Sequence, residues 1–99
     1  MTEARKIASM AEAWHIPVAF HDCTGPVVLA ASTHLAMHAR NCHIQEIVRA
    51  YYFGWYGPLV TALPPLENGR IRPPEGPGLG LALDPERLQA SDVHIRRSA

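Results

Sequence analysis

Two short strand-like segments, separated by one helix-length segment, constrain this chain of 99 residues more than any other feature. Residues 16–20 (IPVAF) and 44–48 (IQEIV) are too short for helices and are typical of strands. The separation between Val18 and Glu46 is close to the roughly 30 residues of one strand–helix–strand unit. The spacing therefore predicts two parallel strands joined by a right-handed helical crossover.

Helical patterns precede and separate these strands. Residues 3–14 have the periodicity of an amphipathic helix. Its apolar face carries Ile7, Met10, Ala11 and Trp14. Residues 26–39 predict a second helix that begins with Pro26 and is apolar around most of its circumference, as expected for a helix packed between layers. The front half is therefore helix–strand–helix–strand, and the fold class is α/β.

The back half has a different composition. Residues 54–85 hold seven of the nine prolines and six of the seven glycines, which favours loops. We therefore divide the chain into a structured part, residues 1–50, and an irregular Pro/Gly-rich tail, residues 51–99. Two parallel strands with open edges do not close a sheet, because parallel strands normally have covered faces and further neighbours. The pattern predicts one part of a larger α/β assembly.

Composition excludes several classes of partner. Nine Lys and Arg balance nine Asp and Glu, so no electrostatic argument favours nucleic acid or an anionic membrane. No apolar run approaches the roughly 20 residues that span a bilayer. Two cysteines are too few for a disulfide framework, which predicts a reduced, cytoplasmic setting. Without a basic patch, the aromatic side chains of residues 51–56 are expected to be buried rather than to stack on bases.

His21 and Glu46 are the candidate catalytic residues. His21 follows the first predicted strand, and functional sites gather at the C-terminal ends of parallel strands, where histidine serves as an acid or base near neutral pH. Glu46 interrupts an apolar strand, where a buried carboxylate requires a partner. The alternatives are a loop histidine bonded to backbone and a glutamate facing solvent. Two parallel strands would place both side chains at one mouth of a sheet or barrel.

A Cys/His metal site is a second, weaker hypothesis. It would use Cys23, His34, His38 and Cys42. His34 and His38 share a helix face, but Leu35 stands where the zinc-protease motif has glutamate, so surface or packing roles are favoured. Asp22 points to the opposite face of the strand from His21, and we expect it to cap the following turn.

The residues also resemble a known family. The stretches IPVAFHDCTGPVVLAASTHLA and IQEIVRAYYFGWYGPLVTALPPLENGRIRPPEGPGLGLALD are similar to the C-terminal part of enolase-superfamily proteins. Within that superfamily they resemble the mandelate racemase/muconate lactonizing enzyme family, and its acid-sugar dehydratases of the galactonate dehydratase type in particular. The resemblance covers residues 3–96, and its motifs are HDCTGP, QE and PP..E.G..RPP.GPGLG.

This resemblance implies a fold. Such proteins combine an α+β capping domain with a modified TIM barrel, (β/α)7β. Residues 16–20 would be the seventh barrel strand and residues 44–48 the eighth, with residues 3–14 as the helix before the seventh. Residues 51–99 would be a C-terminal tail that packs back on the capping domain. The chain would then be a C-terminal fragment of the barrel.

The resemblance also implies a reaction. In such enzymes Mg²⁺ binds the carboxylate of a sugar acid, a base removes the α-proton, an enediolate forms and a β-hydroxyl leaves. His21 would be the general base, and Glu46 would hydrogen-bond the carboxylate side of the substrate and the enediolate. The metal ligands would lie on the third, fourth and fifth strands. We therefore expect no metal bound to this chain and no turnover by this chain alone.

Two other interpretations remain. One is a fragment of a mandelate racemase-like racemase or isomerase, since these relatives share the barrel. The other is a non-enzymatic assembly module that covers its open strand edges by forming a homo-oligomer or by associating with the missing portion of the barrel.

Overall fold

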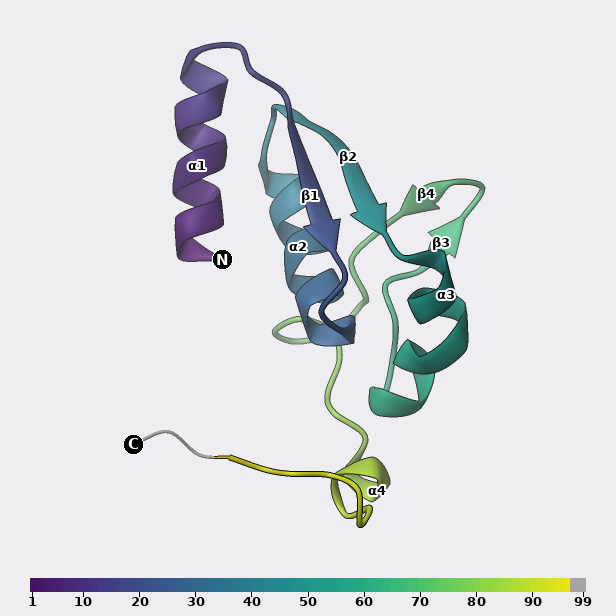
Figure 1. Cartoon of the computed structure of the whole chain (residues 1–99). Helices are drawn as coiled ribbons and strands as arrows, with labels where there is room; N and C mark the ends of the chain where they lie inside the picture. The colour runs from purple at the N-terminus through teal and green to yellow at the C-terminus, as the bar shows by residue number, and fades with distance from the viewer. Residues whose placement is uncertain (97–99) are drawn as a thin grey trace.

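The computed structural model describes residues 1–96. The front half contains four elements in the predicted order (Figure 1). They are α1 (Thr2–Ala13), β1 (Val18–Asp22), α2 (Pro26–His38) and β2 (Cys42–Ile47). The helix–strand–helix–strand prediction is confirmed, with mixed α/β content.

The first strand begins and ends two residues later than the apolar run. The Val18 N–H donates to the Asn41 carbonyl at 2.9 Å and opens the ladder. Pro17 has no N–H to donate, and the Ile16 N–H instead bonds the Ala11 carbonyl at 2.9 Å to close the end of α1. His21 and Asp22 therefore lie within β1, and the turn begins after them.

The two strands pair in parallel, as predicted. The register shifts once, between Val18 and Ala19, and then sets His21 opposite Glu46. Helix α2 packs against both strands. Ala19, His21, Ile44 and Glu46 are exposed, because they alternate with the residues that face α2. The sheet thus has one covered face and one open face.

Helix α1 forms where predicted, but its apolar face is not packed against the rest of the described chain. Ala8 is the buried residue of α1, whereas Ile7, Met10 and Trp14 are 63%, 70% and 78% exposed. The helix is attached through the Asn41 amide, whose Nδ2 donates to the Ala8 carbonyl at 3.0 Å. This hydrogen bond lies on the Ala8 side of the helix. The apolar face with Ile7, Met10 and Trp14 stays uncovered.

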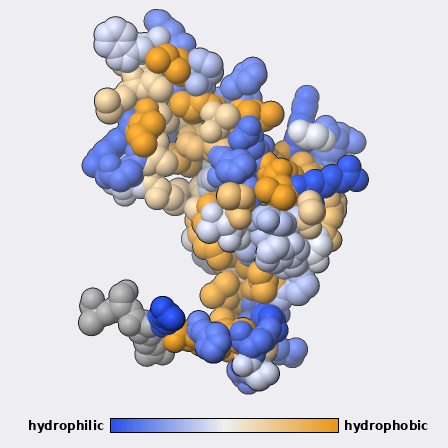
Figure 2. Space-filling model, viewed as in Figure 1, coloured by the Kyte–Doolittle hydropathy of each residue, from blue (hydrophilic) through white to orange (hydrophobic). Residues whose placement is uncertain are grey.

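Helix α2 forms the centre of the core on one side only. Leu29 and Ala30 are completely buried, while Val28 is 41% and Met37 69% exposed. The prediction of a helix packed between layers therefore holds for its strand-facing side. Val27 on the same helix is also exposed, at 39%. Figure 2 shows hydrophobic residues on the visible surface of the molecule.

The tail contains more regular structure than its proline and glycine content predicted. Its elements are α3 (Arg49–Tyr51), a π-helical turn (Tyr52–Tyr56), a 3-10 turn (Gly57–Leu59), β3 (Leu66–Glu67), β4 (Arg70–Ile71) and α4 (Pro85–Leu88). The three helical segments follow one another without a gap. Strands β3 and β4 form an antiparallel hairpin, and irregular chain lies before β3 and between β4 and α4 (Figure 1). None of the helices in residues 1–96 is both long and apolar enough to cross a membrane.

The expected burial of the aromatic side chains holds for only part of the run. Tyr56 is 2% exposed, but Phe53 is 67% and Trp55 is 56% exposed. A single π-helical turn projects its side chains in several directions, so they cannot all face the core. Phe53 and Trp55 instead pack edge-on against neighbouring aromatic rings, as in the 4.6 Å contact between Trp55 and Tyr51.

Candidate functional site

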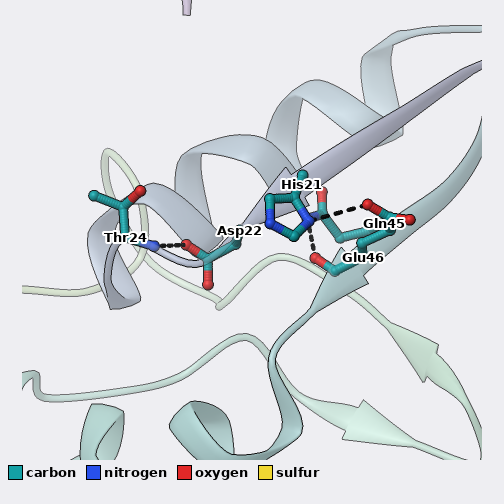
Figure 3. Close-up of polar contacts among 5 residues, drawn as sticks. All are labelled: His21, Asp22, Thr24, Gln45 and Glu46. Carbon is teal, nitrogen blue, oxygen red and sulfur yellow. Dashed lines mark hydrogen bonds and ion pairs between the residues drawn. The ribbon is translucent and has the colours of Figure 1, made fainter.

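His21 and Glu46 meet on the open face of the sheet. The His21 Nδ1 atom lies 3.0 Å from Glu46 Oε2 (Figure 3). The two residues are direct partners in the parallel register, so the strand ladder itself brings them together. Their side chains are 56% and 53% exposed. The structure therefore confirms that both candidates lie at one end of the sheet; their chemical roles stay predictions.

The contact with Glu46 favours one protonation pattern of the His21 ring. With its proton on Nδ1, neutral His21 donates to Glu46 and leaves Nε2 as an acceptor, which is the arrangement a general base requires. When Nε2 also takes a proton, the imidazolium and the carboxylate form a charge-assisted hydrogen bond. At this exposure solvent screens the pair, so its contribution to folding stability is small.

Gln45 faces away from this pair. Its Nε2 donates to the Glu46 carbonyl at 2.9 Å, which holds the local backbone of β2. Its Oε1 is buried and has no hydrogen-bond partner within residues 1–96. Gln45 therefore contributes to the site through the backbone that carries Glu46.

Asp22 anchors the turn on the opposite face of β1. Its side chain is 1% exposed, and Oδ1 accepts hydrogen bonds from the N–H groups of Thr24 and Gly25 at 3.2 and 3.3 Å. The predicted turn cap is thus confirmed. Oδ2 accepts a third hydrogen bond, 2.9 Å long, from the Tyr56 hydroxyl. A buried carboxylate with three donors is stabilised where an unpaired one would not be.

Sequence reasoning missed Tyr56. Burial raises the pKa of its hydroxyl well above the ordinary tyrosine value, and the hydrogen bond to Asp22 and the Asp22 charge raise it further. A weak signal was present, because a buried tyrosine hydroxyl needs a partner and Asp22 was already expected on the strand face opposite His21. Nothing local in the sequence joins the two residues.

The Cys/His metal hypothesis is not supported by the described part of the chain. Residues 1–96 contain no group of three His, Cys, Asp or Glu side chains that could hold a metal ion. His34 Nε2 lies 3.2 Å from the Leu79 carbonyl, and Cys42 Sγ donates to the Ile44 carbonyl at 3.7 Å. His34 thus has a packing role, as favoured. The residues present do not fit the magnesium site that the family resemblance implies.

A cavity of about 280 Å³ lies between α1, β1 and α2, and its polar lining comes from His21 and Ser32. The rest of its lining is mainly apolar and includes Phe20, Val28 and Leu35. Glu46, the partner of His21, does not line this cavity and lies on the open face of the sheet.

Curated relatives of the chain are sugar-acid dehydratases. The chain is 39% identical over 95 residues to the D-xylonate dehydratase of Haloferax volcanii, an alignment that covers 96% of the chain and 22% of that relative. It is 37% identical over 89 residues to the D-galactonate dehydratase of Ralstonia nicotianae, covering 85% of the chain and 23% of that relative. The chain spans less than a quarter of the length of either protein.

Solved structures agree with this similarity. An enolase of the mandelate racemase subgroup from Agrobacterium tumefaciens is 63% identical with a TM-score of 0.81, over 87% of this chain and 23% of that chain. An enolase protein from Sargasso Sea environmental sequencing is 44% identical with a TM-score of 0.83, over 93% of this chain and 24% of that chain. The model of the family described as enolase C-terminal domain-like matches residues 1–87. The chain therefore belongs to the enolase C-terminal domain-like family.

Proposed function

We propose that this chain contributes the His21–Glu46 corner of an acid-sugar dehydratase active site. His21 is the general base that removes the proton α to the substrate carboxylate, and Glu46 hydrogen-bonds the carboxylate side of the substrate. The 3.0 Å contact between the two side chains at the ends of paired parallel strands carries the proposal. The names of the curated relatives favour sugar acids as the substrate class.

The proton chemistry follows from the contact. Glu46 holds Nδ1, so Nε2 of His21 takes the α-proton and the resulting imidazolium is stabilised by the carboxylate 3.0 Å away. The electron pair released at the α-carbon forms the new C=C bond while the bond from the β-carbon to its hydroxyl oxygen breaks. The departing hydroxide takes a proton from solvent and leaves as water. The Oε1 atom of Glu46 then remains available to the substrate.

The barrel position belongs to the same proposal. We assign β1 and β2 to the seventh and eighth strands of a modified (β/α)7β barrel and residues 51–99 to a tail that runs toward the capping domain. In this proposal the magnesium ligands lie on other polypeptide; residues 1–96 hold no group of three His, Cys, Asp or Glu side chains that could bind a metal ion. Half-exposed catalytic side chains on an open sheet also cannot exclude water from the reaction. We expect no turnover by the chain alone.

A chimera tests the assignment of the base. In the Haloferax volcanii D-xylonate dehydratase, the segment that aligns with this chain would be replaced by this chain. We expect the chimera to dehydrate D-xylonate and to exchange its α-proton in D2O. His21→Asn should lower both rates by about 10²- to 10⁴-fold, the usual contribution of a positioned general base. His43→Asn, an exposed histidine on the same strand as Glu46, is the matched control and should leave both rates unchanged.

Three outcomes contradict the proposal, two from the chimera and one from an assay of the isolated chain. Unchanged exchange in His21→Asn would remove His21 as the base. Exchange with inversion at the α-carbon and no dehydration would favour the racemase or isomerase interpretation. Turnover of sugar acids by the isolated chain with Mg²⁺ would show that this chain needs no other polypeptide.

An assembly role is the second candidate function. The observation that favours it is the large uncovered apolar area of α1, formed by Ile7, Met10 and Trp14. Contiguous exposed apolar side chains usually mark an interaction surface. The open strand edges and the apolar cavity beside β1 add to this surface. We propose that this surface is covered in a homo-oligomer or by the remaining portion of a barrel.

A further inference from the structure

A second polar contact lies directly behind the His21–Glu46 pair. Asp22 and Tyr56 are 1% and 2% exposed, and the Tyr56 hydroxyl donates to Asp22 Oδ2 at 2.9 Å. Neither residue reaches the open face of the sheet, so neither can touch a substrate bound there. The pair is also unnecessary for closing the turn, because Oδ1 of Asp22 already caps it through two backbone N–H groups.

The contact joins the end of β1 to the segment that follows β2. Asp22 is the last residue of β1 and immediately follows His21. Tyr56 ends the π-helical turn that follows β2 and Glu46. Because successive side chains of a strand point to opposite faces, a fixed Asp22 side chain on one face fixes the direction of His21 on the other. The end of β1 is thus bonded to β2 on one face and to the segment after β2 on the other.

We propose that Tyr56, acting through Asp22, is a positioning residue for the His21–Glu46 pair. It holds the end of β1 against the segment after β2, so that Nδ1 of His21 stays bonded to Glu46 and Nε2 stays directed outward. The effect of Tyr56 on catalysis rests on the proposed function. Its effect on the orientation of His21 does not. Tyr56 itself makes no contact with the reacting atoms.

Nuclear magnetic resonance of the full 99-residue chain tests the coupling directly. The imidazole ¹⁵N shifts of His21 report which ring nitrogen carries the proton, and a folded chain should show Nδ1 protonated and hydrogen-bonded. We expect Tyr56→Phe to lose this signature while the amide spectrum of α2 is retained. Tyr52→Phe is the matched control. It removes a hydroxyl of the same turn, one that donates to the Pro64 carbonyl at 2.7 Å, and should keep the signature.

A conservative change at Asp22 separates hydrogen bonding from charge. Asp22→Asn keeps Oδ1 for the turn, and its amide can bond the Tyr56 hydroxyl, so the His21 signature should persist. This variant can still overturn the proposal where Tyr56→Phe fails to fold. Loss of the signature in Asp22→Asn would overturn the proposal, because the charge rather than the bond to Tyr56 would then hold His21. Retention of the signature in a folded Tyr56→Phe would also overturn it.

The chimera supplies the catalytic readout. There we expect Tyr56→Phe to lower kcat by about 10²-fold, the effect of misplacing a reacting group by about 1 Å, with little change in KM. Tyr52→Phe should leave kcat unchanged. A large effect of His21→Asn with no effect of Tyr56→Phe would refute the positioning role and leave the proposed function intact. If the chimera with His21→Asn stays active, the proposed role of His21 as general base is refuted. The ¹⁵N shifts of His21 in the Tyr56→Phe chain would then still test whether Tyr56 positions the His21–Glu46 pair.

Discussion

Neighbouring residues of one strand have opposite environments here. His21 is half-exposed on the open face, whereas Asp22 is almost completely buried against the Tyr56 hydroxyl. Alternation along a strand produces this contrast without any change in backbone geometry. At the scale of single residues, β1 therefore presents the candidate base His21 on one face and the buried, hydrogen-bonded Asp22 on the other.

The buried hydroxyl predicts an alkaline dependence of stability. The pKa of Tyr56 in the folded chain lies above its unfolded value of about 10. Its stabilisation is therefore complete below pH ~10 and is lost as the pH rises toward the folded pKa, because the unfolded state releases the proton first. We expect the free energy of unfolding, measured by urea denaturation, to fall above pH ~10 in the wild-type chain and to fall less in Tyr56→Phe.

Tyr56→Phe should also have a lower free energy of unfolding than the wild-type chain at neutral pH. Removing a hydrogen bond to a buried carboxylate costs about 1–3 kcal/mol. Equal pH dependence of the two proteins would contradict the buried position of the hydroxyl. The pKa of Tyr52 is raised in the same direction, chiefly by burial, so a residual alkaline slope is expected in Tyr56→Phe.

At the scale of elements, the tail is held to the front half by a small number of specific contacts. His34 of α2 lies 3.2 Å from the Leu79 carbonyl, and the Tyr56 hydroxyl donates to Asp22 at 2.9 Å. Within the tail, the Thr61 N–H donates to the Ala82 carbonyl at 2.9 Å, close to the first of these contacts. Between Leu79 and Ala82 the chain makes a tight turn in which Gly80 has a φ of 73°. A Cβ atom at Gly80 would lie 2.5 Å from the Pro74 carbonyl oxygen. The tail thus depends on backbone that only glycine can adopt.

Two glycine substitutions separate the effect of the left-handed backbone from the effect of the close approach to Pro74. Gly78 also has a positive φ, 65°, but a Cβ there meets nothing within 4 Å. Gly78→Ala should cost about 1 kcal/mol from the left-handed backbone alone. Gly80→Ala adds the clash with Pro74 and should cost at least ~1 kcal/mol more. Hydrogen exchange at the Ala82 amide checks this. Equal protection in the two variants would argue against the close approach to Pro74.

At the scale of the whole molecule, the chain is more open than its length requires. The radius of gyration is 14.8 Å, against about 13 Å for a compact domain of this size. The sheet has only two strands, and Trp14 at 78% exposure is typical of the uncovered face of α1. Apolar area left in water contributes nothing to folding, so covering it would stabilise the chain. The shape therefore favours association.

Light scattering of the purified chain tests this expectation. We expect a defined oligomer. The fluorescence emission maximum of Trp14 should lie at a shorter wavelength than that of a solvent-exposed tryptophan, because association covers the side chain. Trp14→Ser should weaken association at least about tenfold, as loss of a buried tryptophan anchor does. Trp55→Ser, which changes a tryptophan outside α1, is the control. A monodisperse monomer with a cooperative melt would contradict the assembly role.

Local patterns in the sequence were sufficient to predict the four front elements, the parallel pairing and the placement of His21 and Glu46 at one end of the sheet. Hydrophobic period and segment length are properties of neighbouring residues, and a strand–helix–strand spacing admits few topologies. The family resemblance carried the reaction expected of the pair. These inferences did not require knowledge of which distant surfaces touch.

Only the tertiary structure decided the rest. Tyr56 and Asp22 are 34 positions apart, and no local rule selects that hydroxyl from the three tyrosines of the chain. The amphipathic pattern of α1 correctly predicted a helix but not what lies over Ile7 and Trp14, because periodicity identifies an apolar face and not its partner. Burial is a property of the folded surface as a whole. For that reason the sequence located the candidate base, while the fold revealed the residues behind it.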